Sequence, residues 1–66
     1  MMKIHLNGRD TDTDACTLEQ LIQELEYDPA SLVAEVNRRV IKQAQWHATS
    51  LSSGDTVELL SFVGGG

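Results

Sequence analysis

The stretch Thr56-Val57-Glu58-Leu59-Leu60-Ser61-Phe62-Val63-Gly64-Gly65-Gly66 decides the fold of this chain of 66 residues. Its first part, from Thr56 to Val63, is rich in apolar residues and predicts a β-strand. The three glycines that follow have no Cβ, so they neither hold a strand nor pack against a core. We therefore expect a folded domain over residues 1–63 and a flexible C-terminal glycine tail over residues 64–66.

The tail has two interpretations. A chain of glycines is thin enough to enter a narrow channel, where the carboxylate of Gly66 would react inside the active site of another protein. Chain termini are also commonly disordered without any role. The tail alone leaves both interpretations open.

Composition limits the class of protein and its partners. Ten acidic and five basic residues give a formal net charge of −5, which repels nucleic acid and anionic lipid. The same charge favours a basic protein surface as partner, or serves solubility alone. Cys16 is the single cysteine, which favours a reducing compartment, and no stretch approaches the roughly 18 apolar residues of a membrane span. We expect a cytoplasmic domain with no nucleic-acid or membrane partner.

The N-terminal residues predict a β-hairpin. Apolar and polar residues alternate from Met2 to Leu6, as in a half-buried strand, and Asn7-Gly8 is a strong signal for a tight turn. The segment Arg9 to Asp14 alternates threonine with aspartate and has little apolar content. Because charges discourage pairing with other chains, we expect this segment to be an edge strand.

A helix follows the hairpin. Thr17-Leu18-Glu19-Gln20 fits a capping box, in which the Thr17 hydroxyl accepts from the backbone of Gln20 and the Gln20 side chain reaches back. Asp28-Pro29 is expected to end the helix. Helical spacing places four apolar residues on one stripe: Leu18, Leu21, Ile22 and Leu25. Truncating Leu21 or Leu25 to alanine is expected to cost about 2–5 kcal/mol.

Two further strands precede the last one. Leu32 to Val36 alternates in pattern, Asn37-Arg38 predicts a turn, and Val40-Ile41 begins a short strand. The segment from Lys42 to Ser53 is expected to be irregular, with Trp46 covering the core, and Gly54-Asp55 predicts another turn.

This order of elements predicts an α+β fold. One helix covers one face of a mixed four- to five-stranded sheet, and the first and last strands lie side by side in its centre. The chain resembles the ThiS-type sulfur carrier proteins of the β-grasp (ubiquitin-like) superfamily. The resemblance rests on an ordered set of residues: Asn7-Gly8, Thr17-Leu18, Val36-Asn37, Trp46, Gly54-Asp55 and Phe62-Val63-Gly64-Gly65-Gly66. The chain departs from many relatives at Lys42, where they have proline, and at Arg38-Arg39, where the turn often has glycine.

The resemblance implies a sulfur carrier of thiamine (thiazole) biosynthesis. An E1-like adenylyltransferase of the ThiF type would use ATP with Mg to adenylate the Gly66 carboxylate. A sulfur relay with a cysteine desulfurase would convert it to a thiocarboxylate, which donates its sulfur to a thiazole synthase of the ThiG type. Gly64 and Gly65 would keep the tail slim. The chain itself would be a protein cosubstrate and not an enzyme, would bind no cofactor, and would be monomeric when free.

Three alternatives remain open at the level of the sequence. The first is a sulfur carrier of the type of the molybdopterin synthase small subunit. The second is a ubiquitin-like modifier, whose Gly66 would form an isopeptide bond with lysine. The third is a β-grasp binding module with an idle tail.

The last strand also predicts a docking surface. Val57, Leu59 and Ser61 are expected to face the helix, whereas Glu58, Leu60 and Phe62 face away from it. Large apolar groups on an open face beside the tail indicate partner docking, and Val33 would extend the surface. The alternative is scattered surface hydrophobic residues, which are common.

No metal site is expected. Asp10, Asp12 and Asp14 imitate the start of a calcium loop, but Ala15 and Leu21 occupy its required glycine and glutamate positions. Cys16, His5 and His47 lack the spacing of zinc ligands, and Cys16 is expected to be a half-buried thiol.

Overall fold

The chain folds as a sheet covered on one side by helices. The structure is a computed structural model that describes residues 1–62. Its elements in chain order are β1 (Met2–Leu6), β2 (Arg9–Thr13), α1 (Leu18–Glu24), the 3₁₀ helix η1 (Pro29–Ser31), β3 (Leu32–Val36), β4 (Arg39–Ile41), the 3₁₀ helix η2 (Gln43–Ala48) and β5 (Thr56–Ser61).

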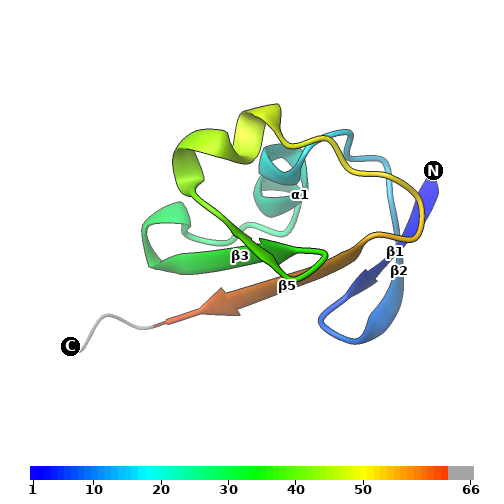
Figure 1. Cartoon of the computed structure of the whole chain (residues 1–66), viewed down its shortest axis with the longest axis horizontal. Coiled ribbons are helices and arrows are strands. Elements are labelled where there is room, and N and C mark those ends of the chain that lie inside the picture. The colour runs from blue at the N-terminus through cyan, green and yellow to red at the C-terminus, as the bar shows by residue number, and fades with distance from the viewer. Residues whose placement is uncertain (63–66) are drawn as a thin grey trace.

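The sheet has five strands in the order β2-β1-β5-β3-β4. β1 and β5 are parallel, and the other neighbouring strands are antiparallel. α1 and η2 lie over one face of the sheet, and the opposite face is uncovered (Figure 1). The predicted α+β fold, with a mixed sheet and the first and last strands adjacent, is confirmed, as is the prediction that the second strand lies at an edge.

Both tight hairpins turn through left-handed backbone. Asn7 and Gly8 have φ of 50° and 82° between β1 and β2, and Asn37 and Arg38 have φ of 51° and 70° between β3 and β4. Positive φ at both central residues matches the right-handed twist of the paired strands. Asparagine and glycine tolerate this conformation well, so the sequence signals at both turns are confirmed.

The side chain of Asn7 extends the pairing between β1 and β5. The two strands pair through His5–Thr56 and Leu6–Val57, where β1 ends. Beyond that point the side-chain amide of Asn7 bonds to the backbone of β5. Its Oδ1 accepts from Leu59 N at 2.8 Å, and its Nδ2 donates to Leu59 O at 3.2 Å. A side chain thus holds β5 where the neighbouring strand has stopped.

The core lies between the helices and the covered face of the sheet. Trp46 of η2 closes one side of it, with its indole Nε1 donating to Ile41 O at 2.8 Å, as predicted for a residue that covers the core. Five large side chains are fully buried: Ile4, Leu18, Leu21, Ile22 and Val57.

The helix differs from its prediction at both ends. Gln20 N donates to Thr17 Oγ1 at 3.2 Å, as expected, but the Gln20 Oε1 accepts from Cys16 N at 2.7 Å instead of from the cap residue. The helix ends at Glu24, because Glu26 adopts a φ of 60° and breaks the helical backbone before Pro29. Leu25 is then the C-terminal cap residue and is 38% exposed, so its predicted place on the buried stripe is wrong, and a smaller cost of truncation is expected.

Other boundaries shift by short distances. The segment predicted to be irregular contains η2, and η1 forms after Asp28, whose Oδ1 accepts from Ala30 N at 3.0 Å. β2 ends one residue early, since the hydroxyl of buried Thr13 accepts from Ala15 N at 3.0 Å. β5 ends at Ser61, and the predicted end of that strand at Val63 lies outside the described residues. No helix in residues 1–62 has the length and apolar character needed to cross a membrane.

Candidate docking surface beside the tail

The predicted reacting group lies outside the described residues, together with Gly64 and Gly65. The structure describes the segment that leads to this group, namely β5 and Phe62. β5 runs toward the end of the sheet away from the N-terminus (Figure 1). Just after the strand, Phe62 N donates to Ser31 O at 2.8 Å, which anchors the backbone immediately before the tail begins.

Side chains alternate between the two faces of β5 as predicted. Val57 and Leu59 are 0% and 5% exposed beneath the helices, whereas Leu60 is 67% exposed on the uncovered face. Phe62 is 48% exposed. Ser61 is exposed, because it lies at the end of the strand where the buried part of the face has ended.

The structure brings Val33 next to this exposed group. Val33 of β3 is the direct partner of Leu60 across the antiparallel pair, so both side chains share the uncovered face. Val33 is 37% exposed. We call Val33, Leu60 and Phe62 the apolar patch. Sequence reasoning missed Val40, which is exposed on the same face because it is paired with Glu35.

Two carboxylates lie next to the apolar patch. Glu58 is the direct partner of Glu35, so two negative side chains face each other across neighbouring strands. They border a hollow of about 320 Å³ that is also lined by Asn37, Arg38 and Thr56. The structure thus exposes Glu58 as predicted and adds Glu35, whose closeness depends on a register that the sequence does not show.

On the other half of the uncovered face, each outward carboxylate of β2 lies opposite a Lys or His side chain. His5 Nδ1 lies 2.6 Å from Asp10 Oδ1, and Lys3 is the direct partner of Asp12. The two ion pairs in the described part of the chain are His5–Asp10 and the N-terminal amine with Asp14. Neither Glu35 nor Glu58 takes part in one.

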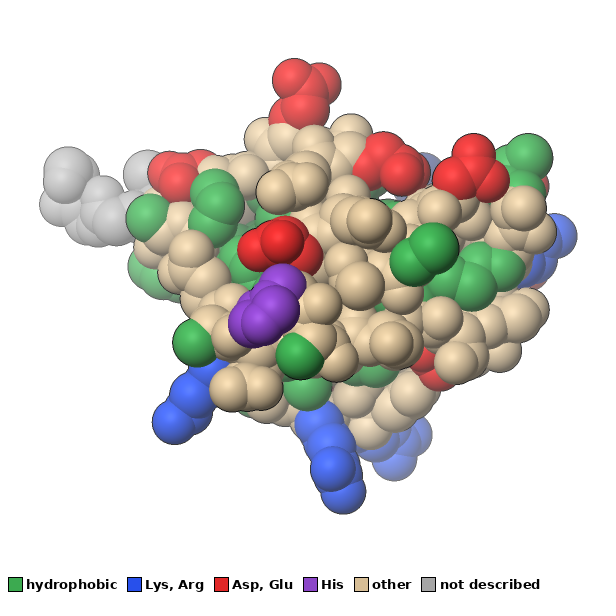
Figure 2. Space-filling model, turned by 90° about the horizontal axis from the view of Figure 1, so that it is seen from above, with side chains coloured by type: hydrophobic (Ala, Val, Ile, Leu, Met, Phe, Trp, Pro, Cys, Tyr) green, Lys and Arg blue, Asp and Glu red, His purple; other side chains and the backbone are tan. Residues whose placement is uncertain are grey.

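The helix-covered side differs from the uncovered face. Figure 2 shows this side, where hydrophobic side chains form small separate areas among polar ones. Most acidic side chains lie toward the upper border of this view, and Lys and Arg side chains lie toward its lower and right borders.

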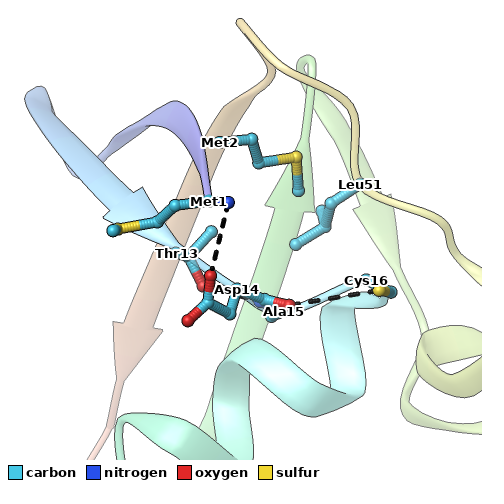
Figure 3. A pocket seen from close by; sticks show the side chains of 7 residues that line it. All are labelled: Met1, Met2, Thr13, Asp14, Ala15, Cys16 and Leu51. Carbon is cyan, nitrogen blue, oxygen red and sulfur yellow. Dashed lines mark hydrogen bonds and ion pairs between the residues drawn. The ribbon is translucent and has the colours of Figure 1, made fainter.

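A second hollow lies at the opposite end of the sheet. It measures about 300 Å³, and the side chains of Met2 and Leu51 extend toward it above Ala15 (Figure 3). It borders the start of β1, and because β1 and β5 are parallel, that start lies far from the end of β5. This hollow is therefore not part of the surface beside the tail.

Cys16 borders this second hollow and is exposed, so the prediction of a half-buried thiol is wrong. It precedes the helix cap, where the Gln20 side chain binds its backbone and leaves the thiol outside the core. Its Sγ donates to Asp14 O at 4.0 Å (Figure 3). Within residues 1–62, no group of three His, Cys, Asp or Glu side chains is placed to hold a metal ion.

Comparison with known proteins identifies the family. The sequence model of the ThiS family matches residues 4–66, which includes the tail. The chain belongs to the ThiS family. The resemblance inferred from the sequence is therefore confirmed.

Individual ThiS proteins match over their full length. The sulfur carrier protein ThiS of Bacillus subtilis is 29% identical over 65 residues, which are 96% of this chain and 98% of that protein. A crystal structure of the thiamine biosynthesis protein ThiS from Geobacter metallireducens superposes with a TM-score of 0.83 at 29% identity, covering 98% of this chain and all of that one. The match confirms the β-grasp fold.

A longer relative contains a ThiS-like segment. A thiazole synthase of Magnetococcus marinus is 38% identical over 66 residues, which are 98% of this chain but 20% of that protein. The chain thus spans about a fifth of the length of this relative. In that protein, the ThiS-like segment is one part of a longer polypeptide.

Proposed function

We propose that this ThiS-family chain is a sulfur carrier of thiamine biosynthesis, with sulfur held as a thiocarboxylate on Gly66. The observation that supports the proposal most strongly is that the family match continues through the glycine tail to Gly66. The chain is then a cosubstrate that presents its terminus, and its own side chains perform no catalysis. This role requires a stable domain, a slim tail and a surface that partners recognise.

The chemistry of the tail follows from the properties of a carboxylate. A carboxylate is a poor electrophile, so it must first be activated: an oxygen of the Gly66 carboxylate attacks the α-phosphorus of ATP, displaces pyrophosphate and forms an acyl-adenylate. The outer sulfur of a persulfide on the sulfur relay would then displace AMP and form an acyl disulfide. A second thiol of the relay would attack this disulfide, release the thiocarboxylate and leave a disulfide on the relay. Its sulfur is a polarizable nucleophile that stays covalently bound until it is delivered.

The partners follow from this sequence of steps. An E1-like adenylyltransferase of the ThiF type would bind ATP with Mg and activate the tail, and a cysteine desulfurase relay would supply sulfur. A thiazole synthase of the ThiG type would accept it. The Magnetococcus marinus thiazole synthase supports the last partner, because it contains a segment similar to this chain. We place the carrier in the cytoplasm as a monomer when it is free.

We further propose that the apolar patch is where these partners dock. Leu60 and Phe62 are large, exposed and directly before the tail, and Val33 extends them on the neighbouring strand. Exposed apolar clusters of this kind supply the central contacts of protein interfaces. The three-glycine tail could then reach the active site of a partner that covers the apolar patch.

Intact-mass measurement tests the proposed function. The purified chain is incubated with a ThiF-type enzyme, ATP, Mg and a sulfur-relay system, and the expected change is the exchange of one oxygen for sulfur. A ladder of heavier conjugates would indicate a protein modifier, and an unchanged mass would indicate an idle tail. Co-purification of a molybdopterin synthase large subunit in place of thiazole synthase would identify a different sulfur acceptor.

Two tail variants serve as controls for this measurement. Deletion of Gly65 and Gly66 should abolish the mass change and leave the midpoint of thermal unfolding unaltered, because glycines add no packing. Gly66→Ala keeps a terminal carboxylate but adds a methyl group at the reacting residue. A strong loss of sulfur incorporation in Gly66→Ala would show that the slimness of the tail matters as well as its charge.

A further inference from the structure

The uncovered face of the sheet contains one anomaly among its charged pairs. On the half formed by β1 and β2, Lys3 directly opposes Asp12, and the imidazole of His5 lies against the carboxylate of Asp10. On the half formed by β3 and β5, Glu35 directly opposes Glu58. Like charges in directly opposed positions destabilise a sheet.

The described part of the chain does not compensate this pair. Neither Glu35 nor Glu58 forms an ion pair there, although Arg38 lines the same hollow. The hollow that both carboxylates help to line measures about 320 Å³. A space of this size beside two carboxylates is suited to a guest side chain with a positive charge.

The position of the hollow indicates which protein supplies the side chain that binds there. Glu58 and Glu35 are two residues along their strands from Leu60 and Val33, so the carboxylates and the apolar patch form one continuous surface. A protein that covers the patch is therefore positioned to contact the hollow as well. The formal net charge of −5 complements a basic partner.

We propose that Glu35 and Glu58 form a receptor site for an arginine or lysine side chain of the activating enzyme that docks on the apolar patch. This inference rests on the proposed function and deepens it, since it names the chemistry of the partner surface. A guanidinium group has five donors in a planar fork and can bind both carboxylates at once. Binding of the cation removes the repulsion between the two strands, so the site is stabilised by the partner and strained without it.

Steady-state kinetics of adenylation test the site. The double variant Glu35→Gln/Glu58→Gln keeps side-chain size, removes two charges and should raise the KM for the carrier about tenfold with kcat unchanged. The matched control Asp10→Asn/Asp12→Asn removes two charges from the same face and should leave KM close to that of the wild type. The difference between the two variants should shrink at high ionic strength.

Thermal unfolding provides an independent measurement on the free chain. Because the Gln variants relieve like-charge repulsion, their unfolding midpoint should be higher than that of the wild type. A lower midpoint would show that Arg38 already neutralises the carboxylates within the chain and would overturn the proposal.

Other outcomes separate the possible occupants. Equal KM values for the Glu35/Glu58 and Asp10/Asp12 variants would overturn the receptor site while leaving sulfur carriage intact. Stabilisation of the wild type alone by Mg²⁺ or Ca²⁺ would assign the hollow to a metal ion, and concentration-dependent dimers lost in the Gln variant would assign it to a second copy. If the wild type gains no sulfur at all, the proposed function fails and this inference fails with it.

Discussion

The two faces of β5 differ in what their residues do. Val57 and Leu59 face the helices and are almost completely buried, so they contribute to stability. Glu58 and Leu60 alternate with them, face solvent, and add little to the core. The comparison teaches that a single strand of six residues can separate folding from recognition, because its period of two sends neighbouring side chains to opposite faces.

The largest expected effect concerns the covered face. Leu21→Ala removes a fully buried side chain from α1 and should lower the free energy of unfolding by about 2–5 kcal/mol. Chemical denaturation measures this change. Below the unfolding transition, the folded variant should still be adenylated with an unaltered KM, and a raised KM in fully folded protein would contradict the separation of the two faces.

The next effect concerns the uncovered face. Leu60→Asp places a charge in the centre of the apolar patch and should weaken binding of the activating enzyme by about 2 kcal/mol or more. Isothermal titration calorimetry measures the affinity, and circular dichroism should show an unchanged fold. Phe62→Asp is expected to act in the same direction.

Ala44→Asp is the matched control for the Leu60 variant. It introduces the same charge at an exposed position of η2, on the helix side of the sheet. Its affinity for the enzyme should equal that of the wild type. If both variants lose affinity equally, general charge repulsion and not the apolar patch would explain the loss.

A smaller effect is expected at the boundary between the faces. Asn7→Gly keeps the left-handed backbone of the turn but removes both hydrogen bonds to Leu59, and should destabilise the domain by about 1–2 kcal/mol. Hydrogen exchange should then be faster at the amide of Leu59. Asn37→Gly removes the bond from Thr56 N on the other side of β5 and should leave the Leu59 amide protected.

The smallest expected effect concerns the C-terminal end of α1. Leu25→Ala should cost less than about 1 kcal/mol, because the Leu25 side chain is 38% exposed at the helix end. Denaturation of Leu25→Ala beside Leu21→Ala compares two leucines of one predicted stripe. Equal losses would show that Leu25 packs in solution as the helical period suggests.

Local patterns in the sequence predicted most of the fold. Asn7-Gly8 and the alternation from Met2 to Leu6 predict the hairpin, because the turn and the strand depend on neighbouring residues only. The 3₁₀ helix over Gln43–Ala48 was missed, since a short polar segment has no hydrophobic period. The helix end was also misplaced, because it depends on the left-handed backbone at Glu26 and glutamate is no signal for that conformation.

The candidate site was predictable only in part. Leu60 and Phe62 follow from alternation along one strand, whereas Glu35 becomes important only when β3 is placed in register with β5. These two glutamates are far apart in the sequence, and no local pattern determines the register in which two strands pair. A search for like charges at outward positions of neighbouring strands, once the sheet order is assumed, would have found the pair.

The parallel pairing of β1 with β5 has a consequence for folding during synthesis on the ribosome. β5 lies between β1 and β3, yet it is the last strand of the domain to leave the ribosome. Until then the N-terminal hairpin and the β3–β4 hairpin have no common neighbour, so the sheet stays divided during synthesis. Folding of this domain therefore waits for its final strand, and a chain truncated before Thr56 should be recognised by chaperones and proteases as unfinished.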